Sequence, residues 1–528
     1  MKPSSFLPIS LRRRCSSLSG SQPLPGTCST ERAIEQVPLK ASLGRETTQV
    51  AIIGAGFAGL AVASHLQDAG VSDFVLLERA SAIGGTWRDQ VYPGCACDVP
   101  SHLYSLSSHL NPHWTRRHSG SSELLDYLKA IVASRQLSSH LRLGVTVKQA
   151  VWDEAEAQWS LVIDGGTPLR AQFLVMATGS LREPKLPKIA GLESFAGNAF
   201  HSARWDHSCE LSGRDVAVVG TGASAIQFIP EVAKLARRVT VFQRNAPWVM
   251  PRRDKAISAL SKRLFERVPG LMQLNRARLY WELELAAIGF VAWPSLMRLA
   301  EYRARVHLER SIRDPELRRV LTPNYRLGCK RVLSSNAYYP AMNQPHVRVV
   351  TDPIVEITPE GVRTEKETSD CDVLIFGTGF SITRSLTAVD IVGRGGRHLL
   401  QTWRTTPGAY LGMHIHHFPN LFLMTGPHTG VGHTSLLFMI EAQANYVIEC
   451  LKLLKQKRKR VLEIRQEAQL DFSLEMQKRS RSTVWESGCE SWYLDKKGRN
   501  VALWPGNTFE YWLRTRRPVD RRYLLSDR

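Results

Sequence analysis

The sequence has no run of about 18 apolar residues, the length that a helix needs to cross a bilayer. The longest candidate, Leu285 to Leu299, contains Pro294 and Arg298. Cysteine pairs of the CxxC type are also absent, and the nine cysteines are an odd number. These absences predict no membrane span, and they favour reduced thiols in a cytosol-like, cytoplasmic compartment.

Acidic residues are scarce. The chain has 48 Asp and Glu against 69 Lys and Arg, which gives a formal net charge of +21. A field of this sign attracts phosphorylated cofactors, anionic lipid surfaces or nucleic acid. No ladder of basic and aromatic residues and no DNA-reading motif accompanies it. We therefore expect no nucleic-acid partner, and we keep a peripheral contact with an anionic surface as the minor alternative.

The N-terminal stretch has no acidic residue before Glu31, and serine, proline and arginine dominate it. Its apolar residues show no sustained amphipathic period, so a disordered extension over residues 1–46 is the favoured interpretation. A transit peptide for organellar import and a start codon placed too early are the alternatives. The 528 residues are too many for one hydrophobic core, so two or more domains are expected.

A strand, a glycine turn and a helix open the first candidate domain. The run Val50 to Ile53 is typical of a buried parallel strand, and it ends at a GxGxxG turn. The first glycine makes the tight turn, the second lets the backbone approach a pyrophosphate, and the third allows close helix packing. A second strand, Phe74 to Leu77, ends at Glu78, whose carboxylate suits a ribose diol and would repel a 2′-phosphate. The unit predicts FAD or NAD.

The same design returns at residues 214–244. The strand Val216 to Val219 leads into a turn in which alanine replaces the third glycine. The second strand, Val239 to Phe242, ends at Gln243 and Arg244 instead of at an acid. A guanidinium at this place favours a ribose that carries a 2′-phosphate, so this unit should prefer NADPH to NADH. Its turn comprises Gly220, Thr221, Gly222, Ala223, Ser224 and Ala225.

Two further buried strands end in Thr-Gly, within residues 173–179 and 372–379. We expect both to lie in the first sheet, which makes the first domain discontinuous. The predicted fold class is α/β with two Rossmann-like dinucleotide-binding domains. An arginine-rich helical insertion is expected at about 255–310, packed on the core or, as the alternative, lying on a membrane surface. The expected parts are an FAD-binding segment 47–180, an NADPH-binding domain 181–371, and the rest of the FAD domain with the C-terminal region, 372–528.

Two loop motifs resemble those of type I Baeyer–Villiger monooxygenases, within the class B flavoprotein monooxygenases. One runs from Gly84-Gly85-Thr86-Trp87 through Tyr92-Pro93-Gly94 to Asp98. The other matches the pattern FxGxxxHxxxW(P/D). The likeness runs from about residue 48 to the C-terminal region and includes both glycine turns. Residues of the second motif are Phe195, Gly197, His201, Trp205 and Asp206.

The resemblance implies an NADPH- and O2-dependent oxidoreductase that converts ketones to esters or lactones through a C4a-peroxyflavin. Arg331 would lie over the flavin, where a fixed cation stabilises a peroxide anion, and Asp98 would hold it in place. Lys330 would join Arg244 on the 2′-phosphate. His201 would help couple NADPH binding to domain movement without performing chemistry.

Motifs and resemblance together give two sets of cofactor contacts. The expected FAD contacts are Gly54, Gly56, Phe57, Ala58, Gly59, Glu78, Gly85, Thr86, Trp87, Asp98, Tyr104 and Val147. The expected NADP contacts are Ala96, Cys97, Asp98, Gly220, Thr221, Gly222, Ala223, Ser224, Ala225, Arg244, Lys330, Arg331 and Trp492.

Three other functions stay open. A heteroatom monooxygenase would oxidise sulfides or amines with the same cofactors. A flavin disulfide reductase would need a CxxC-type pair, and Cys95 and Cys97 have the wrong spacing for one. A basic membrane- or nucleic-acid-associated protein with a degenerate Rossmann fold is the third. No metal is expected, because the histidines near His416 lack carboxylate or thiolate partners at ligand spacing.

Overall fold

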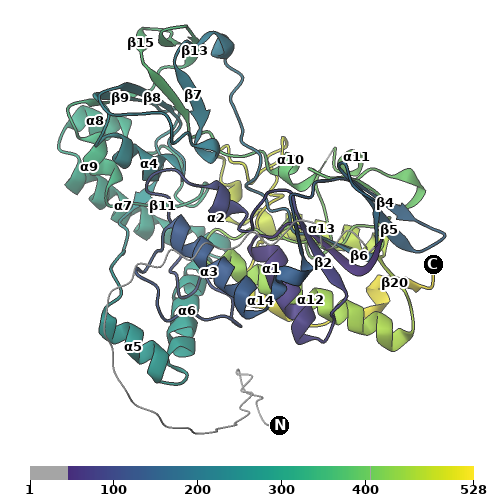
Figure 1. Cartoon of the computed structure of the whole chain (residues 1–528). Helices are drawn as coiled ribbons and strands as arrows, with labels where there is room; N and C mark the ends of the chain where they lie inside the picture. The colour runs from purple at the N-terminus through teal and green to yellow at the C-terminus, as the bar shows by residue number, and fades with distance from the viewer. Residues whose placement is uncertain (1–45, 405) are drawn as a thin grey trace, which may run out of the picture. The chain divides into compact units, whose positions relative to one another are not determined.

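Two sheets organise the computed structural model, which describes residues 46–404 and 406–528 (Figure 1). The predicted disordered extension, apart from Glu46, lies outside these residues. The first sheet has the strand order β17-β4-β5-β6-β1-β2-β3, and β18 pairs with β6. Its strands are β1 (Thr47–Ile53), β2 (Phe74–Glu78), β3 (Leu141–Leu143), β4 (Val147–Asp153), β5 (Gln158–Ile163), β6 (Leu169–Met176), β17 (Asp390–Val392) and β18 (Leu421–Leu423).

The centre of this sheet is parallel and buried on both faces. β1 pairs in parallel with β2 and with β6. Alternate side chains point to opposite faces, so Val50 and Ile52 join the core under α1 (Phe57–Asp68) and α12 (Leu436–Lys457), which lie side by side (Figure 1). Ala51 and Ile53 face a second core on the β4–β5 side. Two buried faces explain the uninterrupted apolar run that predicted this strand.

The second sheet is wholly parallel, in the order β12-β9-β8-β16-β7. α4 (Ala225–Val232) begins directly after the second glycine turn and contains Pro230 in its last turn. α4 and α9 pack against each other beside this sheet. The strands are β7 (Asn198–His201), β8 (Asp215–Val219), β9 (Arg238–Phe242), β12 (Val347–Val350) and β16 (Val373–Phe376), and α9 is Tyr338–Met342.

The predicted return to the first sheet at residues 372–379 is wrong. β16 pairs with β8 and β7 and so belongs to the second sheet. A short apolar strand ending in Gly-Thr-Gly fits either parallel sheet, and only its pairing decides between them. The chain returns to the first sheet later, at β17. The two connections lie side by side, because Lys185 donates its backbone N–H to the carbonyl of Gly379 at 2.9 Å.

The arginine-rich insertion is helical, as predicted. It comprises α5 (Ala259–Arg267), α6 (Leu271–Val291) and α7 (Met297–Ser311). Within the described residues no single helix is long and apolar enough to cross a membrane. α6 taken together with Pro294–Ser311 meets the length and composition criteria, but the pair is bent by 110°.

Shorter elements complete the chain. The remaining helices are α2 (Thr86–Asp89), α3 (Ser121–Ser134), α8 (Pro315–Val320), α10 (Ile382–Leu386), α11 (Leu399–Thr402), α13 (Gln466–Ser480) and α14 (Thr508–Arg514). Small sheets are formed by β10 (Val249–Met250) with β11 (Leu333–Ser334), by β13 (Ile354–Ile357), β14 (Gly361–Thr364) and β15 (Thr368–Asp370), and by β19 (Val461–Ile464) with β20 (Tyr523–Ser526).

One pair of cysteines contradicts the expectation of reduced thiols. Cys329 and Cys489 form a disulfide across 160 residues of sequence. The other cysteines within the described residues are free, namely Cys95, Cys97, Cys209, Cys371 and Cys450. Cysteine number and spacing could not reveal the pair, because the fold alone brings two such distant residues together.

Candidate active site

A cavity of about 1700 Å³ is lined by the carboxyl ends of parallel strands from both sheets. Ligands of doubly wound folds bind at this edge of a sheet. Most of the predicted cofactor contacts line the cavity, but Gly59 and Ala225 do not. Those that do are Gly54, Gly56, Phe57, Ala58, Glu78, Gly85, Thr86, Trp87, Ala96, Cys97, Asp98, Tyr104, Val147, Gly220, Thr221, Gly222, Ala223, Ser224, Arg244, Lys330, Arg331 and Trp492.

The first glycine turn packs closely against the neighbouring strand and its own helix only because side chains are missing. Gly54 has a φ of +109°, and a Cβ there would lie 2.5 Å from the Ala177 carbonyl oxygen. A Cβ at Gly59 would lie 1.9 Å from the Gly54 carbonyl oxygen, so the third glycine lets the helix close onto the turn. A turn that leaves backbone bare at the N-terminus of a helix fits a pyrophosphate.

Glu78 is fixed at the end of β2. Its carboxylate accepts the backbone N–H groups of Ala55 at 2.9 Å and Ala80 at 3.1 Å. Arg88, which the sequence analysis missed, donates to the same carboxylate at 3.1 Å and also lines the cavity. Nothing in a single sequence marks this arginine, which comes from the short helix α2 beyond the turn. The acid thus lines the cavity at the end of β2, with a cation beside it.

Two cations lie on the cavity wall of the second unit, one just after β9 and one from the loop before β11. Arg244 and Lys330 both line the cavity, and Lys330 Nζ donates to Asn245 Oδ1 at 3.1 Å. Lys330 also lies over the ring of Tyr325, 4.6 Å from its centre. Burial and the positive charge of Arg244 lower the pKa of Lys330. Two cations that repel each other in this way fit a doubly charged anion such as a 2′-phosphate.

Arg331 and Asp98 form an ion pair in the same cavity. Nε and Nη2 of Arg331 donate to one oxygen of Asp98, at 2.8 and 2.6 Å. Both side chains are surrounded by protein, and their exposed fractions of 41% and 32% face the cavity they line. Burial alone would raise the pKa of the Asp98 carboxyl, but the charges of Arg331 and Arg252 hold it below its usual value. The charge of Asp98 raises the pKa of Arg331, so this cation is permanent.

The loop that carries Asp98 is tied through Gln227 to α4, the helix that follows the second glycine turn. Tyr92 Oη donates to the Gln227 side chain at 2.9 Å, and Gln227 Nε2 donates to the Ala96 carbonyl at 2.9 Å. Arg252 donates to the Cys97 carbonyl at 2.8 Å. Neither Gln227 nor Arg252 carries a signal that a single sequence reveals. They link the two nucleotide units at the ion pair.

The second loop motif lies away from the cavity, at the connection between the sheets. His201 ends β7 and accepts the Ala203 N–H on Nδ1 at 3.0 Å, and its ring contacts Phe380 edge-on at 5.8 Å. Trp205 packs on Phe228, with ring centres 5.4 Å apart. A Cβ at Gly197 would lie 2.2 Å from the Asp372 carbonyl oxygen. Phe195 packs against the core beside the second sheet, and Asp206 accepts a hydrogen bond from Ser208. All of these contacts are made within the protein, so the motif has a structural role here.

A cluster of potential metal ligands lies elsewhere. His416, His417 and Glu463 bring one ligand atom each within 4.8 Å of the others. The fold thus supplies the carboxylate that sequence spacing did not show. Arg394 already donates to Glu463 at 2.8 Å, and the backbone N–H of His417 donates at 2.9 Å. The Arg394 guanidinium thus pairs with the Glu463 carboxylate, so the cluster is an ion-pair site in the structure.

Comparisons with known proteins agree with this geometry. A Baeyer–Villiger monooxygenase from Streptomyces coelicolor is 44% identical over 475 residues, which are 89% of this chain and 91% of that protein. The chain belongs to this family. A Baeyer–Villiger monooxygenase from Pseudomonas aeruginosa is 42% identical over 90% of this chain and 91% of its own. Residues 51–289 match the pyridine nucleotide-disulphide oxidoreductase family model.

Solved structures give the same result. An oxidised steroid monooxygenase bound to NADP aligns with a TM-score of 0.81 at 28% identity, over 91% of this chain and 100% of its own. Cyclohexanone monooxygenase from Rhodococcus sp. Phi1 bound to NADP⁺ aligns with a TM-score of 0.80 at 26% identity, over 92% and 100%. The chain is an FAD-dependent, NADPH-using monooxygenase of the Baeyer–Villiger type with an α/β Rossmann-like fold, which confirms the predicted family, fold class and cofactors.

Proposed function

We propose that this Baeyer–Villiger monooxygenase converts small-molecule ketones to esters or lactones at the Arg331–Asp98 pair. The observation that carries the proposal is a permanent cation, held through two nitrogens by one carboxylate, in a cavity lined by both nucleotide turns. FAD and NADPH, when bound, would supply hydride transfer and the activation of O2 in this cavity.

The residues of this chain have separate tasks. The turn from Gly54 and the acid Glu78 bind FAD, and the turn from Gly220 with Arg244 and Lys330 binds NADPH. Asp98 orients Arg331, whose fixed charge stabilises the negative charge that develops during oxygen transfer. The enclosing cavity limits the access of water. The other predicted contacts that line this cavity, including Trp492, support the same division of tasks.

We also propose how the domains are divided. The FAD domain comprises residues from 47 to about 180 and resumes at β17. The NADPH domain lies between these two parts and includes the helical insertion. Because β16 belongs to the second sheet, the return to the first sheet moves from 372 to β17, which begins at Asp390.

Replacing Arg331 with Ala tests the proposed function. Removal of one electrostatic donor to a developing charge typically costs about 10²–10³ in kcat. We therefore expect ester formation from a ketone panel to fall by at least about 10²-fold, while bound flavin is retained. Arg319→Ala is the matched control, because Arg319 is an exposed arginine on α8 that pairs with Glu316. Ester formation at the wild-type rate in Arg331→Ala would defeat the role assigned to this residue.

The same assay separates the rival functions. A panel that includes sulfides and amines would show heteroatom oxygenation if that activity were the main one. Dithiol-dependent oxidation of NADPH would indicate a disulfide reductase, but Cys95 and Cys97 are both free and buried in the cavity wall. The third alternative, a degenerate Rossmann fold, predicts that the purified protein contains no bound flavin.

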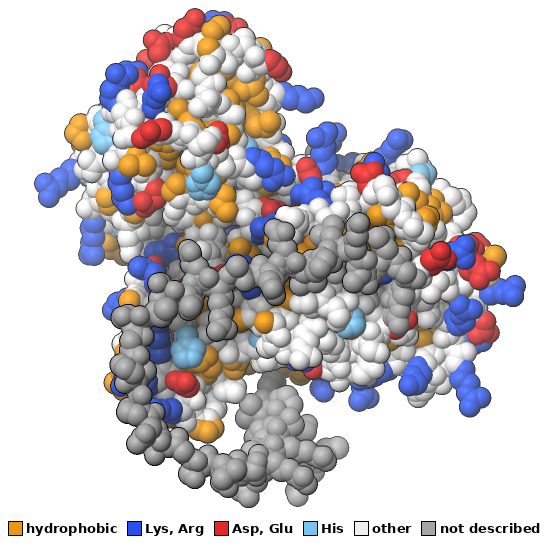
Figure 2. All heavy atoms as spheres, in the orientation of Figure 1, with side chains coloured by type: hydrophobic (Ala, Val, Ile, Leu, Met, Phe, Trp, Pro, Cys, Tyr) orange, Lys and Arg blue, Asp and Glu red, His pale blue; other side chains and the backbone are white. Residues whose placement is uncertain are grey.

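We propose a peripheral contact between the helical insertion and an anionic surface. Trp293 is 64% exposed and Leu299 is 61% exposed, and Leu299 also lines an apolar groove of about 330 Å³ between α6 and α7. Residues 255–310 hold ten Lys and Arg against five Asp and Glu. Lys and Arg side chains also project around the face shown in Figure 2. Exposed apolar side chains among basic ones suit the interface of an anionic bilayer.

Vesicle sedimentation tests this contact. We expect more protein on phosphatidylcholine vesicles that contain phosphatidylserine than on phosphatidylcholine alone, and loss of that excess in Trp293→Ala/Leu299→Ala. Leu470→Ala changes a leucine of similar exposure on α13 and is the control. Equal sedimentation on both vesicles, or dimerisation without vesicle binding, would contradict the contact. A cytoplasmic location stays a prediction, and the segment that would carry an import signal lies outside the described residues.

A further inference from the structure

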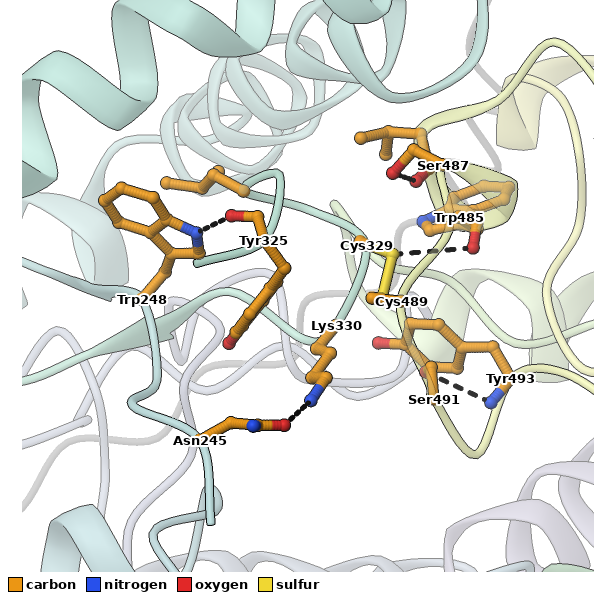
Figure 3. The surroundings of a disulfide bond; sticks show 12 residues. Asn245, Trp248, Tyr325, Cys329, Lys330, Trp485, Ser487, Cys489, Ser491 and Tyr493 are labelled. Carbon is orange, nitrogen blue, oxygen red and sulfur yellow. Dashed lines mark hydrogen bonds between the residues drawn. A yellow bond between two sulfur atoms is a disulfide. The ribbon is translucent and has the colours of Figure 1, made fainter. Parts of the chain in front are cut away.

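The disulfide joins the two segments that flank the cavity near the ion pair (Figure 3). Cys329 directly precedes Lys330 and Arg331, between α8 and β11. Cys489 follows the short 3-10 helix Val484–Glu486 and leads into Trp492. Lys330, Arg331 and Trp492 line the cavity, whereas neither cysteine does. The disulfide therefore lies behind the residues that form the cavity wall, and it does not line the cavity itself.

The second segment closes part of the cavity. Tyr493 is 2% exposed and stacks edge-on against Trp492 at 4.3 Å. Burial raises the pKa of Tyr493 to about 12, although the charge of Arg331 opposes that rise. Leu494, Asp495, Lys496 and Lys497 continue the wall. Movement of this segment would open the side of the cavity on which Lys330 and Arg331 lie.

We propose that Cys329 and Cys489 are a reversible thiol-oxidation site, and that the closed disulfide fixes the Trp492 segment against the Lys330–Arg331 loop and tightens binding of NADP(H). The inference rests on the proposed roles of Lys330, Arg331 and Trp492. The surroundings of the two sulfur atoms suit thiols as well as a disulfide. Cys489 is half-buried, and Cys329 is fully buried with its Sγ 3.7 Å from the Trp485 carbonyl, an acceptor for a thiol (Figure 3).

The oxidant is a hydroperoxide, H2O2 in the simplest case. The more accessible thiolate of Cys489 attacks a peroxide oxygen, the O–O bond breaks, and a sulfenic acid and one water form after protonation. The sulfur of Cys329 then attacks that of Cys489, and the second water leaves with the Cys329 proton. Two thiols and one H2O2 give one disulfide and two waters. A dithiol such as dithiothreitol reverses the reaction by exchange.

The test uses the purified holoenzyme, reduced with dithiothreitol, freed of reductant and titrated with H2O2. Peptide mapping without reduction should show a Cys329–Cys489 cross-link at about one H2O2 per chain. Reduction should speed NADP⁺ dissociation, measured by stopped-flow fluorescence, by about fivefold or more, the lower end of typical coupling between sites. Cys489→Ser should match the reduced wild type with or without H2O2.

Cys209→Ser is the matched control, because Cys209 is a free, half-buried cysteine that lines neither the cavity nor the disulfide site. It should behave as the wild type does. Failure of the cross-link to form, or equal NADP⁺ dissociation from oxidised and reduced enzyme, would overturn the inference. Ketone conversion measured on the same samples keeps the two proposals apart, since a redox-dependent NADP⁺ rate without ester product would count only against the proposed function.

Discussion

The two nucleotide units share one design and differ in where they place a methyl group and a charge. Gly54 and Gly220 occupy the same place, since a Cβ on each would meet the carbonyl at the end of the neighbouring strand, Ala177 or Gly377. The first unit has Gly59 on its helix and Ala177 at the strand end. The second has Ala225 on its helix and Gly377 at the strand end. The alanine thus stands at the strand end in the first unit and on the helix in the second, where a Cβ on Gly377 would lie 3.1 Å from that of Ala225.

The charges differ in a way that packing does not require. The first unit ends β2 with Glu78, anchored by two backbone N–H groups. The second ends β9 with Phe242, and Gln243 and Arg244 follow. Small residues thus allow the close backbone approaches at each turn, while we propose that the charge after the strand selects the ribose. The two properties should respond separately to mutation.

Gly59→Ala should have the largest effect. The new Cβ would lie 1.9 Å from a backbone oxygen of Gly54, so the helix must move away from the turn. Overpacking of this kind costs about 3 kcal/mol or more. We expect purified Gly59→Ala to lack bound flavin, measured by its absorbance. Ala177→Gly should not restore it, because the clash is with Gly54; full flavin content in Gly59→Ala would break the comparison.

Charge at the strand end should have the next largest effect. Hydrogen bonds to charged groups are worth about 1.5–3 kcal/mol, or roughly 10- to 150-fold in affinity. Arg244→Ala should raise the KM for NADPH by this factor and leave that for NADH nearly unchanged. The measurement is steady-state oxidation of both nucleotides. Arg238→Ala, which changes an exposed arginine at the other end of β9, is the control. An equal rise for NADH would show that Arg244 does not read the phosphate.

The exchanged methyl group gives a smaller, reversible effect. A Cβ at Gly377 would lie 3.1 Å from the Cβ of Ala225, so Gly377→Ala requires neighbours to shift. We expect a loss of about 1–3 kcal/mol in the free energy of unfolding and weaker NADPH binding. Adding Ala225→Gly should restore most of both. Substitutions at residues in contact are not additive in such a cycle. Simple addition of the two losses would therefore show that positions 225 and 377 do not share this contact.

Local patterns explain what the sequence predicted well. Both turns, their strands and the acid or arginine at each strand end are contiguous motifs, and each was found from residues within about thirty positions. The Arg331–Asp98 pair came from a family resemblance, and the structure places these side chains in contact. Spacing alone could not have paired residues 233 positions apart.

Contacts between residues that are distant in the chain could not be predicted from the sequence. β16 carries the same apolar pattern as β6, so its sheet could not be assigned without its partners. Gln227 and Arg252 bond to the Asp98 loop from elements distant in the chain. The disulfide joins two segments for the same reason. The strand pairing, the hydrogen bonds and the disulfide all depend on the tertiary fold, which the periodicity of a sequence does not reveal.

His201 offers the finest test, at the connection between the two units. Burial lowers the pKa of His201 to about 4, whereas an unfolded histidine titrates near ~6.5. Between these values only the unfolded chain binds the proton, so the contribution of the neutral ring to stability is present above about 6.5 and is lost as pH falls toward 4. The loss is at most about 1.4 kcal/mol per pH unit.

His201→Asn should therefore be less stable than the wild type at pH 7, and the gap should narrow on acidification. Denaturant unfolding at several pH values measures it. His113→Asn changes an exposed side chain and serves as the control. A gap that stayed constant from pH 7 to 4 would mean that the neutral ring does not stabilise this junction. A narrowing gap would show that the connection between the acid-tipped and the arginine-tipped unit depends on a histidine kept uncharged by burial.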